Sequence, residues 1–250
     1  MERDVKSMVK PHVFGLEKYV PGEYREGFIK LASNENNYGP SPKVVNAIME
    51  NAGRVHVYPF LDAEVKKLAA KYAGVGVDSV MMGNGSDELM ELVLKTFNGP
   101  VAAVYPSYAS YRIFPRMLGM EFFDVGLLPD FTWDVDDFIA KSKRANLYFI
   151  GNPNNPTGNL VEEEDLVRLL DEGKIVVLDE AYTEFSGGTH IKLTGEYDNL
   201  LVLRTLSKAF GIGGLRVGYM VGNPETVSYV NHLKPPFSIA LLAEFAAMRY

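Results

Sequence analysis

The feature of this sequence that most constrains its fold is a series of short apolar runs separated by helix-length segments. The runs lie at 80–82, 101–105, 147–150, 175–178, 200–203 and 217–221. Because they are apolar at consecutive positions, we expect strands that are buried on both faces. Intervening segments such as 87–97 and 162–170 have the length of crossover helices. The sequence therefore predicts a three-layer α/β/α sandwich with a mostly parallel central sheet.

Helix signals flank this series of runs. Ser41 followed by Pro42 is typical of a helix start, and the apolar spacing up to Gly74 predicts two helices over 41–74. The last stretch, 238–250, has an apolar helix pattern without a cap or a polar tail. We expect such a helix to pack on a segment further along a longer chain.

Composition narrows the partners of the chain. A net charge of −7 and a pI near 5.2 leave no broad basic surface, so we expect no nucleic-acid partner. The absence of cysteine excludes disulfides and thiolate metal sites. No two histidines have the helical spacing of a zinc motif, so no metal is assigned. No apolar run approaches the ~20 residues of a membrane span, and we expect a cytoplasmic protein.

Polar residues directly after the apolar runs matter most, because ligands of such sheets lie outside the carboxyl ends of the strands. The segment 83–88 (GNGSDE) opens a helix pattern and suits a phosphate held on free backbone N–H groups. It lacks the third glycine of a dinucleotide-binding motif and the Gly-Lys-Ser/Thr of a P-loop, so neither NAD nor ATP is favoured. A capped turn without a ligand explains this segment equally well.

Three further segments place polar groups at the same edge. Tyr108 follows the second run, where its ring can stack on a planar heterocycle or simply pack. The segment 152–158 (NPNNPTG) is a proline-constrained turn after the third run. Asp179 ends the fourth run, and a carboxylate buried there needs a cationic partner. Tyr182 faces the same side if the loop turns helically.

Lys208 is the candidate for covalent chemistry. It lies after the fifth run in the segment 204–216 (RTLSKAFGIGGLR), next to Ala209 and Phe210. An amine in partly apolar surroundings has a lowered pKa, which frees it to attack a carbonyl. A solvated surface lysine is the simpler interpretation of this residue taken alone.

Taken together, these motifs resemble the fold-type I pyridoxal 5′-phosphate (PLP) aminotransferases. The segments 155–158 (NPTG), 179–182 (DEAY) and 207–216 stand in the order of that family. Within the group, the sequence is most similar to the histidinol-phosphate aminotransferases, through 31–36 (LASNEN) and 204–210 (RTLSKAF). The resemblance runs from about residue 19 to the end and does not cover the small C-terminal domain of the family.

The resemblance implies roles for the residues at matching positions. Lys208 would hold PLP as a Schiff base and then act as the catalytic base, and Asp179 would pair with the ring nitrogen. Tyr108 would stack on the ring, while Asn155 and Tyr182 would bind its phenolic oxygen. The residues implied to hold the phosphate are Gly85, Ser86, Asp87, Thr205, Ser207 and Arg216.

Two further roles follow from the resemblance alone. Tyr58 would reach the cofactor phosphate of a partner subunit, which implies a homodimer with a shared active site. Tyr19 and Asn34 would lie near the substrate. The implied domains are an N-terminal arm and substrate-side segment at 1–40, a PLP-binding large domain at 41–235, and the start of a C-terminal region at 236–250. The missing domain would supply an arginine for the carboxylate or phosphate of the substrate.

The implied reaction transfers an amino group from L-histidinol phosphate to 2-oxoglutarate, a step of histidine biosynthesis. Threonine-phosphate decarboxylases and aromatic-amino-acid aminotransferases are similar in the same motifs, because each needs the same cofactor contacts. A PLP-binding module without catalysis would retain the phosphate site and the ring contacts. Lys208 favours an enzyme, because such a module does not need a positioned proton shuttle.

Overall fold

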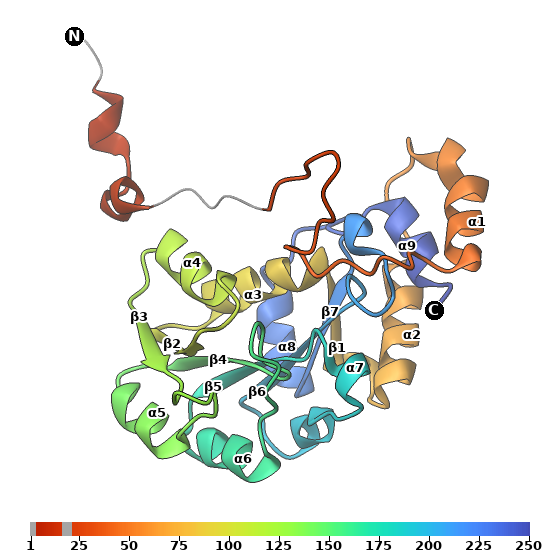
Figure 1. Cartoon of the computed structure of the whole chain (residues 1–250). Coiled ribbons are helices and arrows are strands. Elements are labelled where there is room, and N and C mark those ends of the chain that lie inside the picture. Colours follow the sequence, from red (N-terminus) through yellow and green to blue (C-terminus); the bar gives the residue numbers. More distant parts are fainter. Residues whose placement is uncertain (1–3, 17–21) are drawn as a thin grey trace.

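The computed structural model describes residues 4–16 and 22–250 (Figure 1). Within these ranges the chain forms a seven-stranded sheet in the order β1-β7-β6-β5-β4-β2-β3. Strands β2 to β6 pair in parallel, whereas β7 runs antiparallel to both β1 and β6. The strands are β1 Val80–Gly83, β2 Val101–Tyr105, β3 Phe122–Gly126, β4 Leu147–Gly151, β5 Ile175–Asp179, β6 Leu200–Thr205 and β7 Gly218–Gly222. The mostly parallel sheet predicted from the apolar runs is confirmed.

Helices cover both faces of this sheet, as Figure 1 shows. The α-helices are α1 Pro42–Asn51, α2 Asp62–Ala73, α3 Gly85–Thr96, α4 Ser110–Met117, α5 Val135–Lys141, α6 Glu163–Asp171, α7 Thr183–Ser186, α8 Pro224–Asn231 and α9 Leu241–Ala247. Short 3-10 turns lie at Val5–Met8, Pro11–Gly15, Ala52–Arg54, Val77–Ser79, Ile191–Gly195 and Gly213–Leu215. None of the helices in the described ranges is both long enough and apolar enough to cross a bilayer.

Apolar side chains gather in two clusters, one on each face of the sheet. Along β5, Val176 belongs to one cluster and Val177 to the other, because successive strand residues point to opposite faces. Helices α5 and α6 pack on the first cluster through Phe138 and Leu166. Helices α3 and α8 pack on the second. Both faces of the sheet are therefore covered, which confirms the predicted three-layer α/β/α sandwich.

The ends of the helices follow local chemistry. Helix α1 begins after Ser41 with Pro42, although the Ser41 side chain makes no capping hydrogen bond. Proline sets the start, because its fixed φ suits the first helical position. Helix α2 ends at Gly74, whose left-handed φ of +71° lets its N–H bond the carbonyls of the last turn.

Two parts of the sequence prediction need correction. Strand β3 has no counterpart among the predicted runs, because it is an edge strand with only Val125 fully buried and so lacks a continuous apolar run. The apolar stretch 238–250 contains a shorter helix than its pattern indicates, α9. This helix packs on α1 within the described fold, so part of its apolar face has a partner here.

Candidate active site

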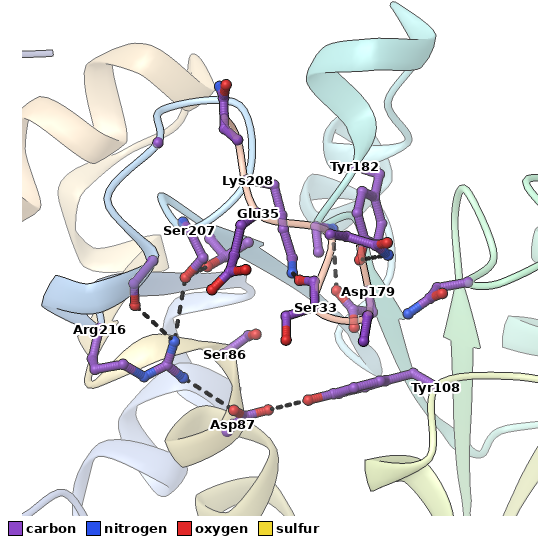
Figure 2. A pocket seen from close by; sticks show the side chains of 18 of the residues that line it. Ser33, Glu35, Ser86, Asp87, Tyr108, Asp179, Tyr182, Ser207, Lys208 and Arg216 are labelled. Carbon is purple, nitrogen blue, oxygen red and sulfur yellow. Dashed lines mark hydrogen bonds and ion pairs between the residues drawn. The ribbon is translucent and has the colours of Figure 1, made fainter. Parts of the chain in front are cut away.

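A cavity of about 700 Å³ opens at the carboxyl ends of the parallel strands. Its walls come from the segment 32–36, the start of α3, the loop before α4, the end of β5 and the loop after β6 (Figure 2). The structure brings most of the sequence-predicted residues to this cavity. Those that line it are Asn34, Ser86, Asp87, Tyr108, Asn155, Asp179, Tyr182, Thr205, Ser207, Lys208 and Arg216.

Lys208 points into the cavity from the loop after β6 (Figure 2). Its Nζ donates a hydrogen bond of 2.8 Å to the backbone carbonyl of Ser33 and lies 5.6 Å from the ring centroid of Tyr182. Burial, and then the positive charge of Arg216, lowers the pKa of Lys208. Both effects favour the neutral amine, which is the nucleophilic form.

Asp179 ends β5 and is only 5% exposed. Its Oδ2 accepts a hydrogen bond of 2.8 Å from the Tyr111 hydroxyl, and its Oδ1 accepts one of 3.1 Å from the backbone N–H of Ala181. Burial raises the pKa of Asp179 to about 6, against the lowering effect of these two donors. None of the ion pairs in the described part of the chain includes Asp179, so the structure holds a buried acid without a cationic partner.

A polar corner of the cavity forms around Arg216, beside the first turn of α3. The Arg216 Nη2 lies 3.0 Å from Asp87 Oδ2, and its Nη1 lies 3.4 Å from Ser207 Oγ. Gly85 has a φ of +77°, and a Cβ built on it would lie 2.6 Å from Arg216 Nη2. Only glycine leaves room for the guanidinium at this point. Thr205 completes the corner through a 3.0 Å hydrogen bond to Ser207 Oγ.

Another part of the cavity lining comes from the segment 32–36, which contains Asn34. Asn34 Nδ2 donates a hydrogen bond of 2.9 Å to the Tyr182 hydroxyl, so a residue far away in the sequence fixes Tyr182. Asn155 lines the cavity from the proline-rich turn after β4. Polar groups from three separate segments therefore line the cavity.

Two of the predicted site residues that the structure describes do not line this cavity. Gly85 lies next to the Arg216 guanidinium but is not among the residues that line the cavity. Tyr58 is 73% exposed, and its ring packs against Phe237 at 4.8 Å between centroids. Tyr19 lies outside the described residues.

Sequence reasoning missed two side-chain contacts of this site. Tyr111 was not singled out, although it follows Tyr108 by three residues and so shares its face of the turn that begins α4. Asp87 was expected to act through its backbone, but its carboxylate also accepts a 3.1 Å hydrogen bond from the Tyr108 hydroxyl while it pairs with Arg216. The three-residue spacing was a usable signal for Tyr111, whereas the Asp87 contacts depend on tertiary structure.

Comparison with known proteins places the chain in an aminotransferase family. The family model "Aminotransferase class I and II" matches residues 26–248, and the chain belongs to this family. The chain is 38% identical to the histidinol-phosphate aminotransferase of Thermoanaerobacter pseudethanolicus, over 98% of this chain and 72% of that protein.

Solved structures agree with this assignment. The histidinol-phosphate aminotransferase of Sinorhizobium meliloti, solved in complex with PLP, superposes with a TM-score of 0.85 at 25% identity, over 97% of this chain and 70% of that chain. The L-threonine-O-3-phosphate decarboxylase of Porphyromonas gingivalis superposes with a TM-score of 0.76 at 26% identity, over 86% of this chain and 66% of that chain. Both comparisons extend over most of the present chain.

Aminotransferases of this family depend on PLP, and the cavity residues fit that cofactor. PLP carries an aldehyde, a ring nitrogen that becomes cationic, and a phosphate. The cavity offers an amine with a lowered pKa in Lys208. It also offers a buried carboxylate without a cation in Asp179, and a guanidinium beside the first turn of α3 in Arg216. Each reactive part of the cofactor therefore has a chemically matched group.

Proposed function

We propose that this protein is a histidinol-phosphate aminotransferase. It would transfer the amino group of L-histidinol phosphate to 2-oxoglutarate, giving imidazole acetol phosphate and L-glutamate in histidine biosynthesis. The observation that carries the proposal is the meeting of Lys208, Asp179 and Arg216 around one cavity at the carboxyl edge of the sheet. The similarity to curated histidinol-phosphate aminotransferases supports the choice of substrate.

Lys208 and Asp179 perform the proton chemistry in this proposal. When bound, PLP supplies a ring that accepts the electron pair released as the α-C–H bond of the substrate breaks. Lys208 Nζ would hold the cofactor covalently until the amino group of the substrate displaces it, and the freed amine would then take the proton from the substrate α-carbon. Its lowered pKa favours the neutral base. Asp179 holds a proton on the ring nitrogen, because a buried carboxylate without a cation gains most from a cationic neighbour.

The remaining cavity residues bind and orient the cofactor. Arg216 and Ser207 bind the phosphate together with Thr205 and the backbone of 85–87, because a helix start and a guanidinium both favour an anion. Tyr182 and Asn155 donate hydrogen bonds to the phenolic oxygen of the ring. The remaining groups are Tyr108, which packs on the ring face, and Asn34, which positions Tyr182 at the substrate side.

We also propose that the protein acts as a homodimer with shared active sites. Tyr58 supports this arrangement, because its side chain is 73% exposed and does not line the cavity of its own chain. A hydroxyl so placed is free to bind the cofactor phosphate of a second copy. Light scattering should give twice the monomer mass of 27.8 kDa. A monomer at micromolar concentration would contradict the shared site.

The experiment that tests the proposed function compares wild type with Lys208→Ala. Purified wild-type protein with PLP should show the visible absorption of a lysine-bound cofactor and should form glutamate from histidinol phosphate and 2-oxoglutarate. Lys208→Ala should lose the absorption and lower turnover by at least about 10³-fold, because one residue is both nucleophile and base. The control is Lys95→Ala, a surface lysine paired with Glu91, which should behave as wild type.

Substrate assays on the same protein separate the alternatives. Phenylalanine and tyrosine test the aromatic-amino-acid aminotransferase, and carbon dioxide from threonine phosphate tests the decarboxylase. Carbon dioxide without glutamate would move the protein to the decarboxylases. PLP binding without either product would leave a non-catalytic PLP-binding module.

A further inference from the structure

Tyr111 is a cavity residue to which the proposed function assigns no role. It lies in the first turn of α4, its side chain is 3% exposed, and its hydroxyl donates a hydrogen bond of 2.8 Å to Asp179 Oδ2. Two neighbouring rings fix its orientation, Phe149 and Tyr108, each with its centroid 5.6 Å away. A ring packed in this way cannot turn its hydroxyl away from the carboxylate without disturbing the core.

The direction of this hydrogen bond is fixed by charge. Burial, and then the negative charge of Asp179, raises the pKa of Tyr111 well above its ordinary value. The phenol therefore stays protonated and always donates, which favours the ionised form of the acceptor. Because the backbone N–H of Ala181 donates to Oδ1, both carboxylate oxygens are held. Each oxygen keeps a second lone pair that can accept from a ligand in the cavity.

The other groups around Asp179 do not replace Tyr111. Asp87 on α3 and Glu180 beside it on the chain are negative, and both disfavour the ionised form of Asp179. Lys208 from the loop after β6 is the nearby amine, but its Nζ bonds Ser33 and its pKa is lowered. The remaining groups that face the carboxylate are Tyr108 from the loop before α4 and Tyr182 before α7, which bond Asp87 and Asn34 respectively.

We propose that Tyr111 is a positioning residue, whose hydroxyl keeps Asp179 ionised and aims its free lone pairs at the ring nitrogen of bound PLP. The inference rests on the proposed function, because it assigns the ring nitrogen to Asp179. It extends that function by naming the side chain that prepares the carboxylate before the cofactor arrives. Tyr111 acts through Asp179, and the bond it forms is present without the cofactor.

The first test needs no cofactor. In apoprotein labelled with ¹³C at aspartate carboxyls, the Asp179 signal should titrate with an apparent pKa about one unit higher in Tyr111→Phe than in wild type, because a charge-assisted hydrogen bond is lost. Incorporation of 3-fluorotyrosine at position 111 keeps the shape and makes the donor more acidic, so the Asp179 pKa should fall instead. An Asp179 titration that is the same in all three proteins would overturn the proposal.

A matched control separates the hydrogen bond from packing. Tyr148 on β4 is fully buried, and its hydroxyl has no hydrogen-bond partner in the described part of the chain. Tyr148→Phe therefore removes a buried hydroxyl without removing a donor to Asp179. It should leave the Asp179 titration at its wild-type position, and a shift equal to that of Tyr111→Phe would show that packing is the cause.

The second test uses the holoenzyme. With PLP labelled with ¹⁵N in the ring, the nitrogen signal of Tyr111→Phe should show a smaller protonated fraction near neutral pH than wild type, because the more basic Asp179 carboxylate takes part of the shared proton. Its kcat should fall about tenfold while KM changes less than twofold. A wild type that binds no PLP would refute the proposed function, yet the apoprotein titrations would still decide what Tyr111 does to Asp179. Altered apoprotein titrations with an unchanged ¹⁵N profile would refute the role toward the cofactor alone.

Discussion

Two adjacent carboxylates at the end of β5 are both buried, yet they have opposite surroundings. Glu180 is completely buried and lies 2.8 Å from the Arg204 guanidinium, and it accepts further hydrogen bonds from Thr189 and the backbone of His190. Arg204 also pairs with Glu184 at 3.2 Å. Glu180 therefore has a cationic partner inside the fold on this side of the strand.

Asp179 faces the cavity and receives only neutral donors within the described residues, the hydroxyl of Tyr111 and the N–H of Ala181. Its raised pKa shows that the fold alone does not compensate the buried charge. Burial of a carboxylate therefore does not by itself mark a functional site. A site is indicated where the charge is left for a ligand to neutralise.

Glu180→Gln gives the largest expected effect on stability. The amide keeps the shape but leaves the buried Arg204 guanidinium without its main counter-charge. Breaking a buried pair from one side costs about 3–5 kcal/mol, which for a domain of this size lowers Tm by roughly 10 °C. Urea or thermal unfolding of the apoprotein measures this loss.

The control for this prediction is Glu184→Gln. Glu184 meets the same guanidinium, but its side chain is 14% exposed and its contact is longer, so the loss should be about 1 kcal/mol. Equal losses in the two variants would show that Glu180 is not the main partner of Arg204, and the contrast with Asp179 would then lose its basis.

The contrast between Asp179 and Glu180 also marks the limit of sequence reasoning. The apolar runs predicted six of the strands and the parallel sheet, because strands buried on both faces have an unmistakable pattern. They did not reveal β3, an edge strand with partial burial. The runs also placed Asp179 at the cavity edge. The apolar runs do not distinguish the environment of Asp179 from that of Glu180, because the side chains that contact these two carboxylates, Tyr111 and Arg204, come from distant segments.

The site itself was predicted through motifs more than through periodicity. Lys208, Asp179 and Arg216 were recognised through the resemblance of their motifs to those of the aminotransferase family, and the fold brings them together. Tyr58 is exposed and does not line the cavity of its own chain, so a single chain cannot display the contact that the motif implies. The second role of Asp87 was hidden, because its partners Tyr108 and Arg216 lie on other loops.

Asp179→Asn should change the free energy of unfolding by less than Glu180→Gln does, and it should raise this free energy where Glu180→Gln lowers it. Below pH 3.8 the carboxyl is protonated in both folded and unfolded chains. As the pH rises from 3.8 to about 6 the unfolded chain loses the proton first, because the folded pKa is the higher one. The folded wild-type apoprotein thus loses up to about 3 kcal/mol of stability that the asparagine variant retains.

Urea unfolding of the two apoproteins at pH 3.5 and pH 8 measures this difference. The variant should be the more stable protein at pH 8, and its advantage over wild type should be smallest at pH 3.5. With PLP bound, its turnover should fall about 10²- to 10³-fold, since a neutral amide does not hold the ring-nitrogen proton. Lower stability of the variant at pH 8 would mean that Asp179 is compensated inside the fold as Glu180 is. In that case the ring nitrogen would have to find its counter-charge elsewhere in the cavity.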